Sequence, residues 1–401
     1  MSFPRNDAIA RANLHSGVQA LAQGAGGVFF LVFLLRAGIS VPVILAAQAA
    51  IFIGRFLIRP VLLPLARRLG LKPLVIAGTL GVACQYPLLA EVHGVDAALL
   101  VLCIVTAMGE VCYWLAYNAW FAAIGDVEQR GRQIGAREAL VALAGVIGPI
   151  LGAGALIAAG PRWTFAAVGL VQALAAVPLF GVPNVRIARE APGAFRAARP
   201  AMFILTTDGW FDGVFFFVWP IALFVTLGES IAAFGGAMAL AGLVGAVCGP
   251  VLGRHIDAGH GRRVVLMAYS LAGAIVLLRA ASLGSPWLAV IANASGALLM
   301  PLLSPVLGTA TYNLAKASPC PLRFHMATEA GWDVGGTLAC LGAAGLLALG
   351  GPLSIALLLG IPGVVAGAFL LRRQYPGASA AILLTDAAPA PEAGFNGTGY
   401  T

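Results

Sequence analysis

Long apolar stretches separated by short polar breaks dominate the chain. Twelve of these stretches approach or exceed the roughly 20 apolar residues that a helix needs to cross the hydrocarbon of a bilayer. They cover residues 12–35, 42–65, 73–91, 97–123, 134–159, 163–182, 201–226, 231–253, 264–282, 287–315, 323–349 and 352–371. The breaks between them are rich in glycine, proline and charge. The pattern therefore predicts twelve membrane-spanning helices.

One break is longer than the others and falls near the middle of the chain: VPNVRIAREAPGAFRAARP, residues 182–200. We expect a first bundle at residues 1–182, a cytoplasmic central loop at 183–200, a second bundle at 201–372 and a disordered cytoplasmic tail at 373–401. The N-terminal residues show no small-residue cleavage site, so no cleaved signal peptide is expected.

Composition agrees with the membrane interpretation. The chain is 60% hydrophobic and only 10% charged, whereas soluble domains are about 25% charged. The net charge of +8 does not indicate nucleic-acid binding, because the basic residues sit in short loops and not on one soluble face. The six cysteines include no Cys-x-x-Cys pair, so neither a disulfide framework nor a zinc site is expected.

The distribution of lysine and arginine predicts the orientation of the chain. Of the 24 basic residues, 18 fall on one side: Arg5, Arg11, Arg67, Arg68, Lys72, Arg130, Arg132, Arg186, Arg189, Arg196, Arg199, Arg254, Arg262, Arg263, Lys316, Arg323, Arg372 and Arg373. Arg36, Arg162 and Arg279 are assigned to the other side. Positive residues favour the cytoplasmic side. Both termini are therefore expected in the cytoplasm of a bacterial cell, with the spans in its inner membrane.

The two halves of the chain resemble each other at a displacement of 191 residues. Glu138-Ala139 aligns with Glu329-Ala330, and Gly160-Pro161 aligns with Gly351-Pro352. The displacement corresponds to six spans, which predicts two six-helix repeats. Two such repeats joined by a cytoplasmic loop are typical of transporters.

The sequence at this point resembles the major facilitator superfamily. After the second span, LPLARRLGLKPL carries Arg68, Gly70 and Lys72 at positions of the family's basic loop, although Arg67 replaces its aspartate. After the eighth span, GRHIDAGHGRR repeats the pattern, with Asp257 in the acidic position. The resemblance implies an all-α membrane protein with twelve transmembrane helices in two pseudo-symmetric six-helix bundles.

Two spans contain small residues at spacings that allow close helix packing. Gly148-Pro149-x-x-Gly152 in the fifth span resembles the family's antiporter motif, and the eighth span contains Gly245, Gly249-Pro250 and Gly253. The resemblance implies that these two spans face each other between the halves. Antiport and simple packing both remain open.

Away from the ends of the predicted spans, seven charged residues need partners: Arg55, Arg59, Glu110, Asp208, Asp212, Glu329 and Asp333. A charge at the bilayer centre costs at least ~2.5–3.5 kcal/mol, so such a group faces a partner or water. The family fold implies that the second span lies beside the eleventh, which would pair Arg55 and Arg59 with the two acids of that span. In one interpretation these pairs are a structural lock or gate. In the other, an arginine binds an anionic substrate, and Glu110, Asp208 or Asp212 carries the coupling proton.

Further polar and aromatic residues are candidates for substrate binding. Gln19 and Gln23 form a stripe on the first span with His15, which is expected closer to the surface. The complete set of candidate substrate-binding residues is Gln19, Gln23, Arg55, Arg59, Trp114, Asn118, Trp210 and Asn313. The candidate gate and salt-bridge residues are Arg68, Lys72, Arg130, Glu138, Asp257, Arg262, Arg263, Glu329 and Asp333.

No motif indicates an enzyme. The chain lacks a phosphate-binding loop, a metal-ligand cluster and a clustered nucleophile, so no cofactor or metal is expected. We expect a secondary transporter, acting as a monomer, that exports a small organic or amphipathic solute by alternating access coupled to protons. The alternatives are proton-coupled uptake of a small anionic metabolite and a non-transporting membrane sensor.

Overall fold

A computed structural model describes residues 5–124, 130–187, 190–256, 261–316 and 318–375. The predicted tail at 373–401 falls almost wholly outside these residues. The helices of the first half are α1 (Arg5–Ala25), the 3-10 helix η1 (Gly27–Phe29), α2 (Phe30–Arg36), α3 (Val41–Leu69), α4 (Leu71–Ala90), α5 (Ala97–Ile124), α6 (Arg130–Ala158), α7 (Gly160–Leu174) and the 3-10 helix η2 (Val177–Gly181).

The second half is built in the same way, and no strand occurs among the described residues. Its helices are α8 (Ala194–Asp212), the π-helix η3 (Gly213–Val218), α9 (Trp219–Thr226), α10 (Ile231–Ile256), α11 (Gly261–Ser282), α12 (Pro286–Gly296), α13 (Leu299–Lys316), α14 (Pro321–Ala348), α15 (Leu353–Leu358) and α16 (Gly360–Arg372).

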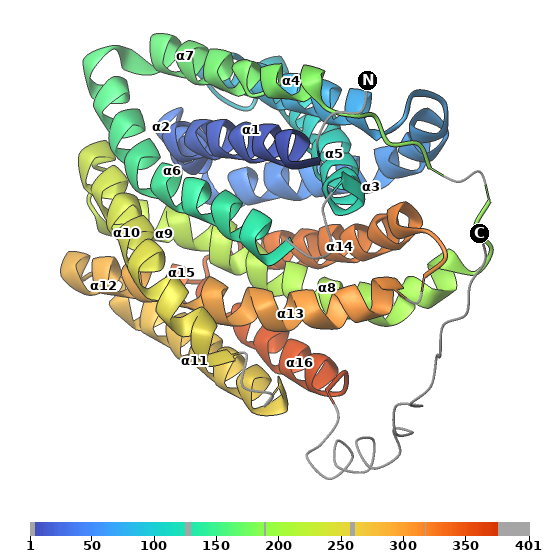
Figure 1. Ribbon diagram of the computed structural model, residues 1–401. Helices are drawn as coiled ribbons and strands as arrows, with labels where there is room; N and C mark the ends of the chain where they lie inside the picture. The colour runs from blue at the N-terminus through green and yellow to red at the C-terminus, as the bar shows by residue number, and fades with distance from the viewer. Residues whose placement is uncertain (1–4, 125–129, 188–189, 257–260, 317, 376–401) are drawn as a thin grey trace, which may run out of the picture.

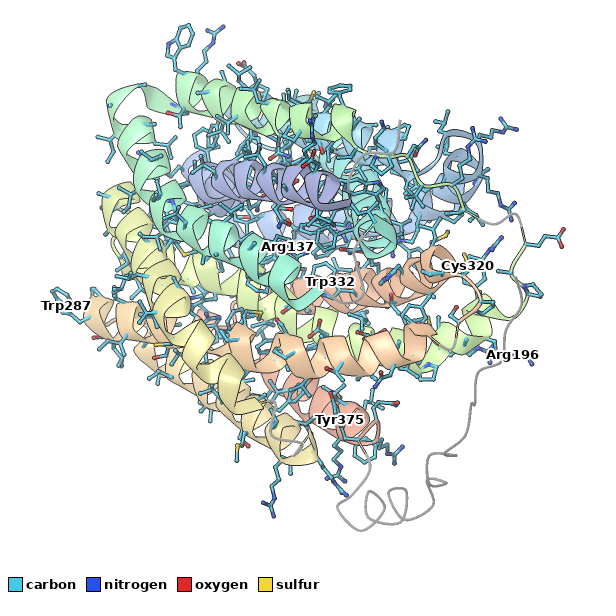
Figure 2. All side chains as sticks on the ribbon, viewed as in Figure 1. Arg137, Arg196, Trp287, Cys320, Trp332 and Tyr375 are labelled. Carbon is cyan, nitrogen blue, oxygen red and sulfur yellow. The ribbon has the colours of Figure 1, made fainter. Side chains whose placement is uncertain are left out.

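Twelve spans long and apolar enough to cross a membrane occur among the described residues, which confirms the number predicted from the sequence. In Figure 1 the helices of the first half occupy the upper part of the view and those of the second half the lower part. α1 begins and α16 ends at the same end of the molecule, where the turn between α3 and α4 also lies. We call this the basic end, because it carries Arg67, Arg68 and Lys72. Figure 2 shows Arg196 at the basic end and Trp287 at the opposite end.

Aromatic packing joins the two halves at the end opposite the basic end. The ring of Phe234 on α10 lies 5.7 Å from that of Phe29 in η1 and 5.7 Å from that of Phe224 on α9. All three side chains are completely or almost completely buried. Each aromatic ring buries a large apolar area, so this contact holds the halves together at that end.

The basic end is less tightly covered. Residues 138–141 of α6 are all exposed. Four consecutive residues point in every direction around a helix, so none of the described neighbours encloses α6 at this level. α6 is therefore less covered at the basic end, although α14 packs against the first half there, with Leu322 and Met326 buried against Leu62 and Ala66.

The small residues of the fifth span contact two different helices. Gly148 and Gly152 lie against the main chain of α1, within the same half. Gly145 instead lies against Gly242 of α10, where the halves meet. α6 and α10 therefore do face each other, and the Pro149 carbonyl of the motif also lies against Gly235 of α10, whereas Gly148 and Gly152 pack α6 onto α1.

The seventh span contains a π-helix that sequence analysis did not predict. Pro220 lies at the second position of α9 and has no N–H to donate to the carbonyl one turn earlier. The preceding turns widen into η3, whose π geometry accommodates the lost hydrogen bond. This irregular segment follows directly after Asp212.

Candidate functional site

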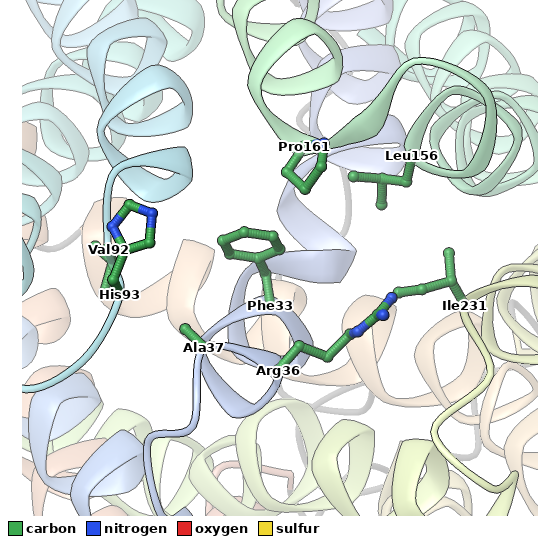
Figure 3. A pocket seen from close by; sticks show the side chains of 8 residues that line it. All are labelled: Phe33, Arg36, Ala37, Val92, His93, Leu156, Pro161 and Ile231. Atoms are coloured by element: carbon green, nitrogen blue, oxygen red, sulfur yellow. The ribbon is translucent and has the colours of Figure 1, made fainter.

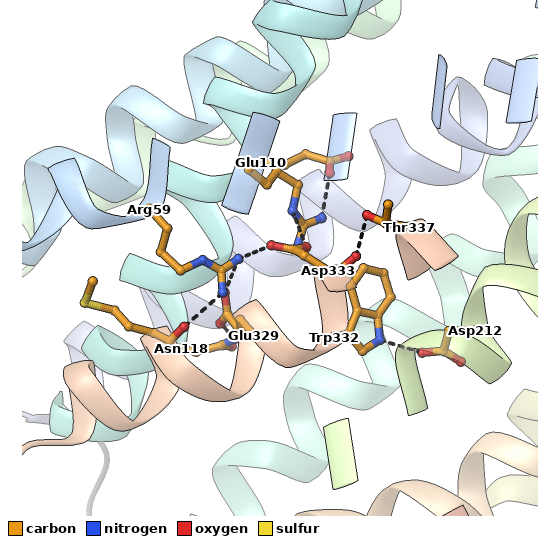
Figure 4. A network of polar contacts seen from close by, with 10 residues as sticks. Arg59, Glu110, Asn118, Asp212, Glu329, Trp332, Asp333 and Thr337 are labelled. Carbon is orange, nitrogen blue, oxygen red and sulfur yellow. Dashed lines mark hydrogen bonds and ion pairs between the residues drawn. The ribbon is translucent and has the colours of Figure 1, made fainter. Parts of the chain in front are cut away.

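The two arginines of the second span lie one turn apart on α3 and point toward α5 and α14 (Figure 4). Arg55 is 6% exposed and Arg59 is 2% exposed, so neither charge is solvated to any extent. Arg55 Nη1 lies 2.8 Å from Glu110 Oε2, and Arg55 Nε lies 3.0 Å from Asp333 Oδ1. Arg59 Nη2 forms an ion pair with the other oxygen of Asp333. The completely buried Asp333 carboxylate therefore bridges both guanidinium groups.

Two further side chains complete this arrangement. Glu329 Oε2, one turn before Asp333 on α14, lies 3.9 Å from Arg59 Nη2. Asn118 Nδ2 on α5 donates a hydrogen bond to Glu329 Oε1 at 3.1 Å. We call the following residues the interface network: Arg55, Arg59, Glu110, Asn118, Glu329 and Asp333. It connects two helices of the first half with one of the second and explains how α3 carries two charges through a span.

The acids of the seventh span lie near the network but are not part of it. Asp208 is buried and Asp212 is half-buried on α8. Trp332 Nε1 on α14 donates a hydrogen bond to Asp212 Oδ2 at 3.0 Å (Figure 4). The same indole ring lies 5.3 Å from Arg55 Cζ. Within the described part of the chain, no ion pair involves either aspartate.

Glycine residues bring α8 and α14 close enough for these contacts. A Cβ added at Gly209 would collide with the main chain of Trp332. A Cβ added at Gly335 would likewise collide with the main chain of α8, at Thr206 and Trp210. Small residues at such positions allow helix backbones to approach within a membrane. Close approach therefore positions the Trp332 indole against Asp212.

The polar stripe of the first span runs from a buried residue, His15, to an exposed one, Gln23. His15 is completely buried, so the expectation that it lies near the surface is wrong. Its Nδ1 donates to a backbone carbonyl at the end of α7 at 2.7 Å, and its Nε2 lies 3.1 Å from the Tyr113 hydroxyl. Gln23 Oε1 accepts a hydrogen bond from Tyr86 at 3.4 Å. The Oε1 atom of Gln19 is buried without a partner among the described residues.

The remaining predicted substrate-binding residues do not converge on one place. Trp114 on α5 is 44% exposed. Trp210 Nε1 donates to the carbonyl of Leu359 at 2.7 Å, so its polar atom points toward α15 and α16. Asn313 on α13 is exposed. Of the predicted amide and tryptophan side chains, only Asn118 joins the interface network.

Comparison with known proteins agrees with this fold. A sequence model of the Major Facilitator Superfamily matches residues 16–209. Over residues 16–209, just under half of its length, the chain matches the major facilitator superfamily. Its fold is that of secondary transporters, and it is a multi-pass membrane protein. No curated protein matches the chain.

Solved structures of superfamily transporters share this fold. The crystal structure of an auto inhibited POT family peptide transporter aligns with a TM-score of 0.69 at 13% identity, over 94% of this chain and 98% of that one. A POT family transporter in complex with 5-aminolevulinic acid aligns at 0.67 and 11% identity, over 90% and 95% of the two chains. FucP in the outward conformation aligns at 0.62 and 14% identity, over 92% and 99%. At these identities the likeness concerns the fold.

The turn after the second span is anchored by an amide. Asn184 Oδ1 accepts a hydrogen bond from the Lys72 main chain at 3.1 Å, and Asn184 Nδ2 donates to the Leu69 carbonyl at 2.8 Å. Lys72 Nζ donates to the Val182 carbonyl at 3.0 Å. The turn is therefore held by the segment that follows the sixth span. Sequence analysis did not identify Asn184, although an asparagine just after a span is a common hydrogen-bonding residue in turns.

The other predicted gate residues lie apart from the interface network. Three basic residues of the two loops are exposed: Arg68, Arg262 and Arg263. Glu138 forms an ion pair with the adjacent Arg137 at 2.7 Å. Asp257 and the side chain of Arg130 lie outside the described residues.

A cavity of about 510 Å³ lies at the end opposite the basic end (Figure 3). Its lining residues are Phe33, Arg36, Ala37, Val92, His93, Leu156, Pro161 and Ile231. None of them belongs to the interface network or to the acid pair of α8. The cavity is therefore separate from the charged residues of the membrane interior.

Arg279 is a buried charge whose surroundings the sequence did not reveal. Sequence analysis assigned it to a loop side, but it is only 3% exposed on α11. Its Nη1 donates to the Phe215 carbonyl at 3.2 Å, and its Cζ lies 3.7 Å from the Phe215 ring and 4.7 Å from the Trp219 ring. The guanidinium thus supports the π-helix through one carbonyl and two aromatic rings. The sequence did offer a signal for this contact. An arginine lies three residues before the end of a predicted span, and another span contains a run of aromatic residues.

Proposed function

We propose that the protein exports a small organic or amphipathic solute in exchange for protons, by alternating access. It would act as a monomer in a bacterial inner membrane with both termini in the cytoplasm. Residues 1–182 and 201–372 would be the two bundles that rock against each other. The exposed residues 138–141 of α6 at the basic end and the aromatic packing at the other end support an opening beside α6 toward the cytoplasm, while α14 stays packed against α3.

The observation that carries this proposal is the difference between two sets of buried acids. Glu110, Glu329 and Asp333 all contact arginines in the interface network. Asp208 and Asp212 form no ion pair among the described residues. A carboxyl group without a cationic partner gains or loses a proton according to its access to water. Asp208 and Asp212 are therefore the proton carriers that we propose.

The interface network would act as the gate between the bundles. Arg55 and Arg59 belong to the first bundle, whereas Asp333 belongs to the second. A rocking motion that separates α3 from α14 must break these ion pairs. If the two helices move together, the pairs remain formed. The exposed Arg68, Arg262 and Arg263 would contribute charge contacts in other states of the cycle. Both arginines are already neutralised, which supports export over the uptake of an anion held by Arg55 or Arg59.

Flux through proteoliposomes under an imposed pH gradient tests this function. A panel of organic compounds is screened for collapse of the gradient, read with a pH-sensitive dye. Compounds that collapse the gradient are then followed directly as solute flux. Asp208→Asn and Asp212→Asn are expected to abolish gradient-driven flux. Asp96→Asn is the matched control, because Asp96 lies in an exposed loop and asparagine preserves its cap on α5.

Two results would contradict the proposal. Full gradient-driven flux in both α8 variants would remove these aspartates from proton coupling. Absence of flux for every compound, in protein shown to be folded by thermal melting, would favour the non-transporting sensor.

A further inference from the structure

The charges of the interface network leave no cation free for an anionic solute. Two guanidinium groups, those of Arg55 and Arg59, face the three carboxylates of Glu110, Glu329 and Asp333. The network is therefore already richer in negative than in positive groups. An anion entering here would meet an excess of like charge in a poorly screening environment.

The acid pair of α8 adds to this negative excess. Asp208 and Asp212 lie one turn apart, and the described residues place no guanidinium or ammonium group in an ion pair with either. The neutral indole N–H of Trp332 is the hydrogen-bond donor to Asp212. A buried carboxylate is stabilised best by a charged partner, and the chain itself supplies none here.

A buried hydroxyl beside the acid pair also lacks a partner. Tyr269 on α11 is 4% exposed, and its hydroxyl makes no hydrogen bond among the described residues. Tyr269 packs in one buried cluster with Ile204 and Phe211, which flank Asp208 in the sequence of α8. Buried polar groups are almost always paired with protein, water or ligand. An unpartnered hydroxyl and two carboxyl groups without a cationic partner therefore occur in the same region of the second half.

Aromatic side chains border this place. The Trp332 ring packs edge-on against Phe52, with ring centroids 5.3 Å apart, and Phe52 in turn packs against Phe217 at 5.2 Å. Trp332 and Phe217 are partly buried, and the Arg55 guanidinium already lies 5.3 Å from the Trp332 ring, so a ligand would meet only the remaining exposed part of each ring. The faces of aromatic rings attract cations, most strongly for tryptophan.

We infer that Asp208 and Asp212 bind the positively charged group of an organic cation whose apolar body packs against Trp332. This inference rests on the proposed function and specifies the class of its solute. The Tyr269 hydroxyl would accept a hydrogen bond from the bound group or donate one to it. The arginines of the interface network are not solute ligands, because their carboxylate partners neutralise them.

A pair of ions that match in size and differ in the sign of their charge tests the inference. Tetraphenylphosphonium and tetraphenylborate are titrated into the purified full-length chain in nanodiscs at equilibrium, without any gradient. Binding is measured as displacement of radiolabelled ion and is corrected with empty nanodiscs. We expect saturable binding of the phosphonium and only nonspecific partitioning of the borate.

Variants of the acid pair locate the bound cation. Asp212→Asn and Asp208→Asn are expected to weaken phosphonium binding by about thirtyfold or more, the usual scale for loss of one partner of a buried charge pair. Asp212→Glu preserves the charge and is expected to retain most of the affinity. Tyr269→Phe is expected to weaken binding less than either asparagine variant, and Asp96→Asn is expected to bind like the parent chain.

The inference is overturned by saturable borate binding, by binding of neither ion, or by phosphonium binding that survives in both asparagine variants. If those variants do not fold, the comparison of phosphonium and borate binding to the parent chain still tests the inference. The result is separate from that of the flux assay. Phosphonium binding without proton-coupled flux would contradict the proposed function alone, whereas coupled flux of neutral or anionic solutes with no cation binding would contradict this inference alone.

Discussion

Arg59 on α3 and Asp333 on α14 form a buried ion pair between residues 274 positions apart in the chain. The pair connects the second span of the first half with the fifth span of the second half. Arg55 contacts the other oxygen of the same carboxylate. One aspartate thus neutralises two arginines at the contact between the halves, and this arrangement leads to the first two predictions.

Asp333→Asn is expected to destabilise the protein far more than Glu329→Gln. Asp333 is completely buried between two guanidinium groups, and removing one partner of a buried pair costs about 3–5 kcal/mol. Glu329 is 15% exposed and lies 3.9 Å from Arg59, so its loss is expected to cost about 1 kcal/mol or less. Thermal melting in detergent micelles measures both. Equal shifts in melting temperature would show that Asp333 contributes no more to stability than Glu329.

Loss of Arg59 is expected to be relieved in part by a second neutralisation. Arg59→Ala leaves Asp333 and Glu329 facing a single remaining guanidinium, which increases the excess of negative charge. Adding Glu329→Gln is expected to recover about 1 kcal/mol or more of stability, because coupled charges are not additive. A double-mutant cycle on melting temperature measures the coupling, with the exposed Arg36→Ala as control. Strict additivity would point to a different partner or to a direct role in solute binding.

Two glycines of α14 provide a matched test of the contact with α8. Gly335→Ala would press a Cβ into the main chain of α8, and overpacking of this kind costs about 1–3 kcal/mol. A Cβ at Gly345 meets no atom within 4 Å, so Gly345→Ala is expected to be neutral or stabilising. Both variants carry the same substitution in the same helix, so their melting temperatures can be compared directly. A destabilisation of similar size at both positions would show that helix flexibility, not packing against α8, determines the effect.

Arg279 is expected to tolerate replacement by methionine better than by lysine. Lysine cannot stack a planar group on Phe215 and Trp219 while donating to the Phe215 carbonyl. Methionine fills a similar volume and removes a buried charge, a replacement that is often neutral or stabilising by about 1–4 kcal/mol for buried ionic groups. Melting temperatures of Arg279→Lys and Arg279→Met give the order. A strong loss in both variants would show that the hydrogen bond to the π-helix dominates.

The candidate site was predictable in its composition but not in its connections. Sequence analysis identified every charged member of the interface network, because a charge inside an apolar span is conspicuous. Glu110 was one of three candidate proton carriers, and its contact with Arg55 could not be predicted from the sequence. It could not identify the link from Trp332 to Asp212, because an indole in a span is usually read as packing. The π-helix was equally inaccessible, since Pro220 alone predicts only a local irregularity.

The sequence by itself determined the number of spans, their approximate limits and the presence of buried charge. Transfer of a segment into hydrocarbon depends on the composition of about 20 consecutive residues, and that is a local property. Only the tertiary structure decided which charges neutralise one another and which remain without a cation. Those contacts join residues 55 to 274 positions apart, and they depend on how each helix is rotated and how closely glycines let it approach its neighbours.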